Sequence, residues 1–107
     1  MTISYKVLVK AATLTGSAAS VYAPAALTSA TISAVSVNNP TGSPVMFNLY
    51  LGTSAGSSTK IVSKSIPAGK AVPVSEAIGH KIEAGMQLFA DGNGMFLNIS
   101  GSEYVES

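Results

Sequence analysis

Cysteine and tryptophan are absent from this sequence, and charged residues are scarce. Only 10% of the residues are Asp, Glu, Lys or Arg, whereas ordinary soluble domains contain about 25%. The lack of cysteine excludes a disulfide framework and a thiolate metal site. The mean hydropathy is +0.40. Low charge combined with high hydropathy is typical of a chain whose surface is partly covered in its working state. Three classes are compatible with it: a membrane protein, a secreted module with a bland surface, or a subunit of an assembly.

Long apolar runs are also missing. A membrane-spanning helix needs about 20 consecutive apolar residues. Here Lys6 and Lys10 bracket one apolar trio, and no later apolar run exceeds a few residues. The N-terminus has no basic segment followed by an apolar one, which would mark a secretory signal. We therefore expect no membrane partner and synthesis in a cytoplasm.

The basic residues include no arginine. All six are lysines that are spread along the chain: Lys6, Lys10, Lys60, Lys64, Lys70 and Lys81. Nucleic-acid-binding surfaces cluster their basic residues and usually include arginine. With a net charge of +1, the composition argues against a nucleic-acid partner.

Short β-rich runs separated by turn residues predict an all-β fold. In the clearest run, Val45 to Leu51, apolar residues alternate with Met46, Asn48 and Tyr50, which is the period of a strand with one buried face. The other strand candidates are Ile3 to Lys10, Ala19 to Ala23, Ala30 to Asn38, Lys60 to Ile66, Ala71 to Val74, Met86 to Ala90 and Met95 to Ile99, the last resuming through Tyr104 and Val105. Ser75 to Lys81 is expected to be a loop or one helical turn.

Turn signals separate these runs. Asn38 to Pro44 and Asp91 to Gly94 contain the Asn, Asp, Gly and Pro residues that tight turns require. The apolar phase shifts between Ile32 and Val35, which predicts a bulge or a strand exposed on both faces. The pattern favours an antiparallel two-sheet sandwich, jelly-roll or immunoglobulin-like, of about seven or eight strands. We expect residues 1–107 to form a single domain, with residues 1–20 as an N-terminal arm or an added strand.

The sequence offers no set of residues for catalysis. His80 is the only histidine, so a Ser-His-acid triad would have one possible base. The five acids lie in turn-like or terminal positions: Glu76, Glu83, Asp91, Glu103 and Glu106. Asp91 and Asn93 could hold a calcium ion weakly, but a plain hairpin turn is the favoured interpretation. We expect no catalytic residue, no cofactor, no metal ligand and no enzyme activity.

The segment from Val35 to Leu51 resembles a group of small structural proteins of tailed bacteriophages. Its members show an Asn-containing turn with Thr/Ser-Gly-Ser, followed by an alternating strand. Their later Pro-Ala-Gly turn, Ala-Gly turn and closing Ser-Gly-x-Glu correspond here to Ile66-Pro67-Ala68-Gly69, Glu83-Ala84-Gly85 and Ser100-Gly101-Ser102-Glu103. The similarity extends from Tyr22 to Glu103. It consists of turn motifs, which specify a fold better than a role.

This resemblance implies a non-enzymatic virion protein. The first expectation is a capsid decoration (cement) protein on the outer virion surface, which binds the capsid lattice and stabilises the shell. Its partner would be the major capsid protein or another virion protein, and a homotrimer or homodimer is expected because closed symmetry is common. The alternative is a head-fibre or tail accessory module that binds host-surface glycan through loops such as Gly52 to Ser58 and Asp91 to Gly94.

Two segments supply the candidate protein-interface residues. The first strand could dock by adding itself to a sheet of the partner, and it contributes Ile3, Tyr5, Val7 and Val9. The clearest strand contributes Met46 and Tyr50, an outward pair of residue types that interfaces favour. The alternative interpretation of Met46 and Tyr50 is two surface residues without a role.

Overall fold

The computed structural model describes residues 2–105, which form nine β-strands and one short 3-10 helix. The strands are β1 (Thr2–Thr13), β2 (Ala19–Tyr22), β3 (Thr28–Asn39), β4 (Val45–Gly52), β5 (Lys60–Ile66), β6 (Lys70–Pro73), β7 (Lys81–Ile82), β8 (Gln87–Asp91) and β9 (Phe96–Val105), and the helix is η1 (Ser75–Ala77). The predicted all-β class is confirmed. Strand β7 is a two-residue addition that the sequence pattern did not reveal.

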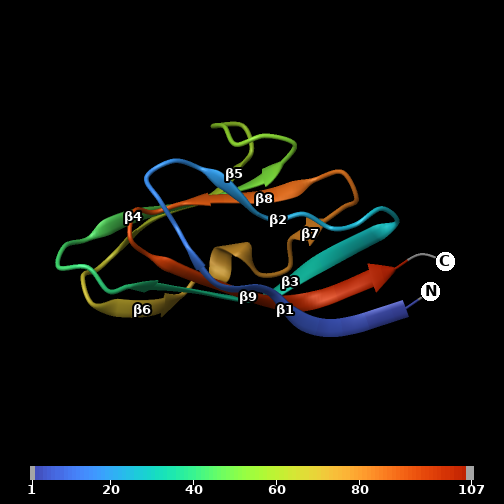
Figure 1. The fold of residues 1–107 in the computed structure, drawn as a ribbon, viewed down its shortest axis with the longest axis horizontal. Coiled ribbons are helices and arrows are strands. Elements are labelled where there is room, and N and C mark those ends of the chain that lie inside the picture. The colour runs from blue at the N-terminus through green and yellow to red at the C-terminus, as the bar shows by residue number, and fades with distance from the viewer. Residues whose placement is uncertain (1, 106–107) are drawn as a thin grey trace.

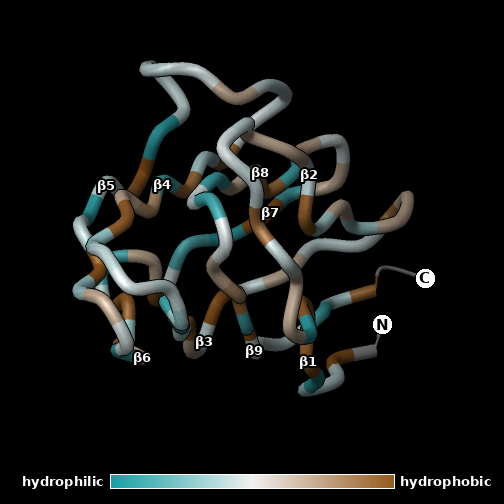
Figure 2. The backbone as a smooth tube through the Cα atoms, turned by 60° about the vertical axis from the view of Figure 1, so that its left-hand side comes forward, coloured by the Kyte–Doolittle hydropathy of each residue, from teal (hydrophilic) through white to brown (hydrophobic). Residues whose placement is uncertain are grey.

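The strands form two antiparallel sheets that pack face to face. Sheet A has the order β1-β9-β3-β6, with β7 also paired to β3, and sheet B has the order β2-β8-β4-β5. Figure 2 shows the two layers, with β1 below β2 at one side of the sandwich and β6 below β5 at the other. The predicted two-sheet sandwich is therefore confirmed.

The connectivity is that of a jelly roll. The antiparallel pairs are nested in the chain: β4 with β5, β3 with β6, β2 with β8, and outermost β1 with β9. Successive pairs alternate between sheet B and sheet A, as happens when one long hairpin is rolled into two sheets. Of the two sandwich types left open by the sequence, this nesting selects the jelly roll.

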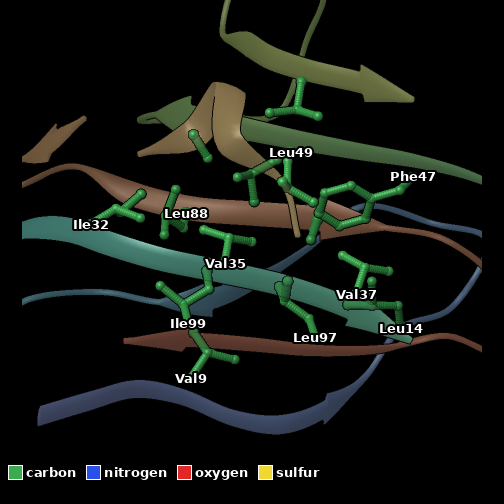
Figure 3. Packing of buried hydrophobic residues seen from close by; sticks show 14 of the residues in the cluster. Val9, Leu14, Ile32, Val35, Val37, Phe47, Leu49, Leu88, Leu97 and Ile99 are labelled. Atoms are coloured by element: carbon green, nitrogen blue, oxygen red, sulfur yellow. The ribbon is translucent and has the colours of Figure 1, made fainter. Parts of the chain in front are cut away.

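The core lies between the two sheets and is entirely apolar in its central layer. Figure 3 shows Val37, Leu97 and Ile99 of sheet A facing Phe47 and Leu49 of sheet B. These five side chains are completely buried or nearly so. Because inward and outward residues alternate along β9, much of β4 and the two parts of β3 on either side of its bulge, the period-two pattern of the sequence becomes one continuous core.

Strand β3 contains the bulge predicted from its sequence. The pairing of β3 with β9 shifts register between Ile32 and Ala34. The extra residue allows Ile32 and Val35 both to point into the core, although three positions separate them. The phase shift in the sequence therefore reflects a bulge, since the opposite face of β3 remains polar.

A buried asparagine organises the turn from β3 to β4. The Asn39 side chain amide donates to the carbonyl oxygens of Ser43 at 3.0 Å and Ile66 at 2.9 Å. Its Oδ1 accepts hydrogen bonds from the backbone N–H of Thr41 at 3.1 Å and from the Thr41 hydroxyl at 2.6 Å. A fully buried amide needs all of these partners, and together they link the turn to the end of β5.

The segment from β6 to β7 is bonded to the edge of β3 that lies opposite β9. Strand β6 pairs with residues 36–39 of β3, and β7 pairs with Ala30 and Thr31. Between them, backbone bonds join Gly79 N–H to Ile32 O at 2.8 Å and Ile32 N–H to His80 O at 3.0 Å. Residues 75–77 form η1, in agreement with the predicted helical turn. This edge of sheet A is therefore occupied by the chain itself.

The two ends of the described chain lie side by side. Thr2 of β1 is paired with Val105 of β9, and the same Val105 is paired with Thr28 of β3. Figure 1 shows the blue N-terminal and red C-terminal strands running next to each other. Residues 2–13 therefore form an integral strand of sheet A.

Candidate protein interface

Strand β1 is the longest edge strand among the described residues. It has 12 residues, pairs with β9 on one side and has no strand on its other side. Strands β2 and β6 have four residues each, and β6 ends at Pro73, while β5 carries Lys60 and Lys64. Long unpaired edges are templates for pairing with another chain, whereas short strands, Pro and Lys protect an edge. The free side of β1 is therefore the principal candidate for a main-chain interaction.

Three apolar side chains of β1 project outward from sheet A. Ile3, Tyr5 and Val7, hereafter the β1 stripe, are 62%, 85% and 53% exposed. Tyr104 of β9, the cross-strand partner of Ile3, is 39% exposed and extends the apolar surface from β1 onto the neighbouring strand. Contiguous exposed apolar residues of this kind mark interaction sites more often than isolated ones.

A bulge in β1 separates Val9 from the stripe. The register with β9 shifts between Val7 and Val9, so one residue of β1 is left without a partner of its own. The shift turns Val9 into the core, where it is 4% exposed beside Ile99. Of the four candidates in the first strand, the structure thus brings three together on one face and places Val9 in the interior.

The two central strands of sheet A present an uncharged outer face beside the β1 stripe. We call this the neutral face; its residues are Ser29, Thr31, Ser33, Ala34, Ser36 and Asn38 of β3 with Phe96, Asn98, Ser100, Ser102 and Tyr104 of β9. Removing uncharged polar groups from water costs far less free energy than removing ions. This face can therefore be covered by another protein without an opposing set of charges.

Two adjoining hollows lie at the β7 end of the neutral face. Their volumes are about 290 and 320 Å³, and both are lined by Ser29, Lys81 and Tyr104. Ile3 borders one hollow and Glu83 the other. Both hollows are shallow depressions in the outer face of sheet A, so the surface beside the β1 stripe is not flat.

On its inner side β1 is attached to the rest of the sandwich by a polar cluster. The Lys6 ammonium lies 3.1 Å from the Glu103 carboxylate, and the Tyr22 hydroxyl donates to the other oxygen of Glu103. Tyr22 belongs to sheet B, so these contacts join the two sheets on their β1–β2 side. The hydrogen bond from Tyr22, aided by Lys6, lowers the pKa of Glu103, while burial and the bond to Glu103 raise the pKa of Tyr22.

Met46 and Tyr50 lie on the outer face of sheet B, away from the β1 stripe. Met46 is 51% exposed, but Tyr50 is only 9% exposed. The Tyr50 hydroxyl donates to Asp91 at 2.8 Å, and the Lys60 ammonium lies 5.7 Å from the centre of the Tyr50 ring. Burial, followed by the bond to Asp91, raises the pKa of Tyr50. Met46 is exposed on this face as predicted, whereas Tyr50 is nearly covered, so only Met46 offers apolar surface to a partner.

The acidic side chains within residues 2–105 are mostly engaged in structural contacts. Asp91 accepts hydrogen bonds from Asn48 and Tyr50, Glu103 binds Lys6 and Tyr22, and Glu76 lies 3.5 Å from Lys64. In this part of the chain, no three His, Asp or Glu side chains lie close enough together to hold a metal ion. Glu106 lies outside the described residues.

Tyr104 lies on this surface, although the sequence analysis did not name it as an interface candidate. Alternation of Asn98, Ser100 and Ser102 with Ile99 and Gly101 continues through the end of the chain. The sequence analysis placed the last strand at Met95 to Ile99, resuming through Tyr104 and Val105, whereas β9 runs without interruption from Phe96 to Val105. Following the alternation alone would have placed Tyr104 on the outer face.

The comparisons with known proteins supply no relative from which a role could be transferred. No helix within residues 2–105 has the length and apolar character that crossing a bilayer requires. The chain matches no family model, no curated protein and no solved structure.

Proposed function

We propose that this protein is a non-enzymatic structural subunit of a bacteriophage virion, a decoration protein that binds the outer capsid lattice through sheet A. The observation that carries the proposal is the β1 stripe, which is continuous with the neutral face. Together they form an apolar and uncharged surface on a protein with a well-filled core. Such a surface is suited to stable contact with another protein.

The jelly-roll fold is compatible with this role. Jelly rolls form viral capsid domains as well as lectins, so the fold alone does not select a function. The turn motifs of Asn38 to Pro44 and Ile66 to Gly69, which resemble those of phage structural proteins, favour the virion. The low charge of the whole chain favours a protein that is partly covered when it works.

The stabilising effect follows from mass action. A ligand that binds the assembled shell and not its separated subunits favours the shell by RT ln(1 + [L]/Kd) at each site. Because the capsid repeats the same site many times, weak individual contacts are sufficient for a measurable effect on the whole particle. No chemistry is required of the decorating protein.

A capsid-binding experiment tests the proposal. Capsids of the encoding phage, produced without this gene, are mixed with the purified protein and sedimented. We expect the wild-type chain to co-sediment at a constant ratio to the capsid protein and to raise the temperature at which the capsids dissociate. Failure of the wild-type chain to bind either compact or expanded capsids would overturn the proposal.

A pair of matched variants tests the surface. Ser100→Glu places a charge in the middle of the neutral face, opposite Val7 of β1 and Ala34 of β3. Ser65→Glu makes the same change at an exposed position on the outer face of sheet B. We expect Ser100→Glu to lose at least tenfold in capsid affinity and Ser65→Glu to bind like the wild type, because only the first introduces an unpaired charge into the contact.

The hollows beside Tyr104 favour one second candidate, a glycan-binding accessory module of a head fibre or tail. An aromatic ring flanked by the Ser29 and Ser102 hydroxyls is suitable for a sugar. Asp91, which belongs to a loop predicted from the sequence to bind glycan, instead accepts hydrogen bonds from Tyr50 and Asn48. Reproducible binding on a glycan array that Tyr104→Ala abolishes, together with absence from the capsid, would support this alternative.

A further inference from the structure

We propose that two copies of this chain join β1 to β1 across a two-fold axis centred on Tyr5, so that their A sheets form one continuous sheet. The proposal concerns the backbone edge of β1 and contacts between neighbouring stripe side chains along that edge, whereas the proposed capsid contact is made by the outer face of sheet A. The two surfaces are perpendicular to each other, and each can be tested without the other.

Strand β1 differs from the other sheet edges because it is long and has one unpaired side. Within residues 2–105, the edge of β3 is covered by β6, η1 and β7, and the edges of sheet B are β2, of four residues, and β5, with two lysines. Only β1 offers a long free row of N–H and C=O groups. Natural proteins rarely leave such a row unoccupied, because it pairs readily with another strand.

The β1 stripe is self-complementary. In an antiparallel pair centred on Tyr5, each Tyr5 lies opposite the Tyr5 of the second copy, and each Ile3 lies opposite a Val7. Directly opposite side chains in antiparallel strands have Cβ atoms about 4.5–5.5 Å apart, and aromatic and β-branched pairs are stabilising there. Ile3, Tyr5 and Val7 of both stripes, which are 53–85% exposed in the single chain, thus gain cross-strand partners.

The charges of Lys6 and Glu103 are also compatible with this pairing. Centring the pair on Tyr5 puts Lys6 opposite Ser4 of the second copy, and Ser4 is itself the cross-strand partner of Glu103. Each Glu103 then has the Lys6 of its own chain at 3.1 Å and faces the Lys6 of the other chain across one strand. Lys10 lies beyond the segment that can pair. No like charges meet.

Neighbouring registers are less favourable. Centring the pair on Lys6 would place two ammonium groups directly opposite each other, which destabilises a strand pair. It would also bring Ile3 to Val9, whose side chain points into the core. Centring on Ser4 would leave Val7 without a partner among the described residues. The bulge between Val7 and Val9 ends the paired segment, so the contact closes as a symmetric dimer.

Mass measurement tests the association. Light scattering of the purified protein at increasing concentration is expected to move from 10.8 kDa toward twice that mass. Tyr5→Lys places two like charges on the axis and is expected to weaken dimerisation at least tenfold, with an unchanged circular-dichroism spectrum because Tyr5 is largely exposed in the single chain. Met46→Lys, at an apolar position on sheet B that is 51% exposed, is the matched control and should dimerise like the wild type.

Cysteine cross-linking tests the register, and the natural chain contributes no competing thiol. Tyr5→Cys is expected to form a disulfide-linked dimer rapidly, because paired strands bring the two Cα atoms within the range that a disulfide spans. Ile3→Cys and Val7→Cys should cross-link slowly alone but readily when mixed, since Ile3 of one copy lies about 13 Å along the strand from Ile3 of the other. Ser17→Cys, in an exposed loop, gives the background rate.

The outcomes are decisive. A monomer at every concentration, a dimer unaffected by Tyr5→Lys, or a Tyr5→Cys rate equal to that of Ser17→Cys would each overturn the inference. Because these measurements contain no capsid, they leave the proposed virion role to its own experiment.

Discussion

At the scale of single residues, a polar cluster joins the two sheets on the β1–β2 side of the sandwich. Glu103 is 16% exposed and binds both Lys6 and the hydroxyl of Tyr22. These residues come from three strands and two sheets. A buried carboxylate is tolerated only when it has such partners, so Glu103 connects the edge strand β1 to sheet B.

The cluster has a predictable pH dependence. The pKa of Glu103 is lowered from its ordinary 4.5 by Tyr22 and Lys6, so the unfolded chain takes up a proton first as the pH falls. The stabilisation is present above pH 4.5 and is lost as the pH falls through the lowered pKa. We expect Glu103→Gln to lower the free energy of unfolding by about 1–2 kcal/mol at pH 7, and by less at pH 3.

Urea unfolding at several pH values measures this effect. The matched control is Glu83→Gln, at an exposed turn position. A Glu103→Gln deficit that stays constant between pH 7 and pH 3 would show that the carboxylate charge is not the source of the stabilisation.

The sequence could not predict this cluster or the role of Asn39. Lys6 and Glu103 are 97 positions apart, and Tyr22 and Glu103 are 81 apart, so no local spacing connects them. Asn39 was recognised as a turn residue, but its bond to Ile66 spans 27 positions. Sequence patterns identify the type of a polar residue, whereas its partners depend on the tertiary fold.

At the scale of elements, alternation predicted strands well where one face is buried over several residues. Strand β5 has the predicted bounds, and the bulge of β3 lies where the apolar phase shifts. Strand β7 was missed because two residues carry no period. The bulge of β1 was missed because Val7, Leu8 and Val9 are all apolar, and that omission placed Val9 among the interface candidates.

The short strand β7 nevertheless has a structural role that can be measured. Ile82 is completely buried, and β7 pairs with Ala30 and Thr31 at the end of β3. Ile82→Ala removes buried methyl groups and leaves a cavity, which typically costs about 2–5 kcal/mol. We expect that loss in urea unfolding, together with faster amide hydrogen exchange at Ile32, whose N–H donates to His80 O.

Ile78→Ala is the matched control for this variant. Ile78 follows η1 in the same connection and is 49% exposed, so its truncation should change the stability by less than about 0.5 kcal/mol. Equal losses for the two variants would mean that β7 does not secure the edge of β3.

At the scale of the whole molecule, the feature that defines the jelly roll is the pairing of the two chain ends. The sequence left jelly-roll and immunoglobulin-like sandwiches open, because local patterns give strands but not their partners. The pairing of Thr2 with Val105 is the most distant in the chain. Non-local pairings of this kind slow folding, to milliseconds or seconds in all-β domains.

A circular permutant tests how the β1–β9 pairing affects folding while the core packing is kept. Opening the chain between Gly16 and Ser17 and joining the old termini with a short Gly-Ser linker makes β9 and β1 an ordinary hairpin. Residues 15–18 are exposed. Thr15 stays attached to β1 in the permutant, so the hydrogen bond from Gly92 N–H to Thr15 O, at 2.9 Å, can be kept.

Because every core contact is unchanged, we expect the permutant to unfold within about 1 kcal/mol of the parent. Its folding, followed by stopped-flow fluorescence of the tyrosines, should be faster, since the β1–β9 pair no longer requires closure of a loop spanning the chain. Equal folding rates would place the β1–β9 pairing after the rate-limiting step. A permutant that fails to fold would show that β1 needs its covalent connection to β2, contrary to the view of β1 as a strand held chiefly by β9.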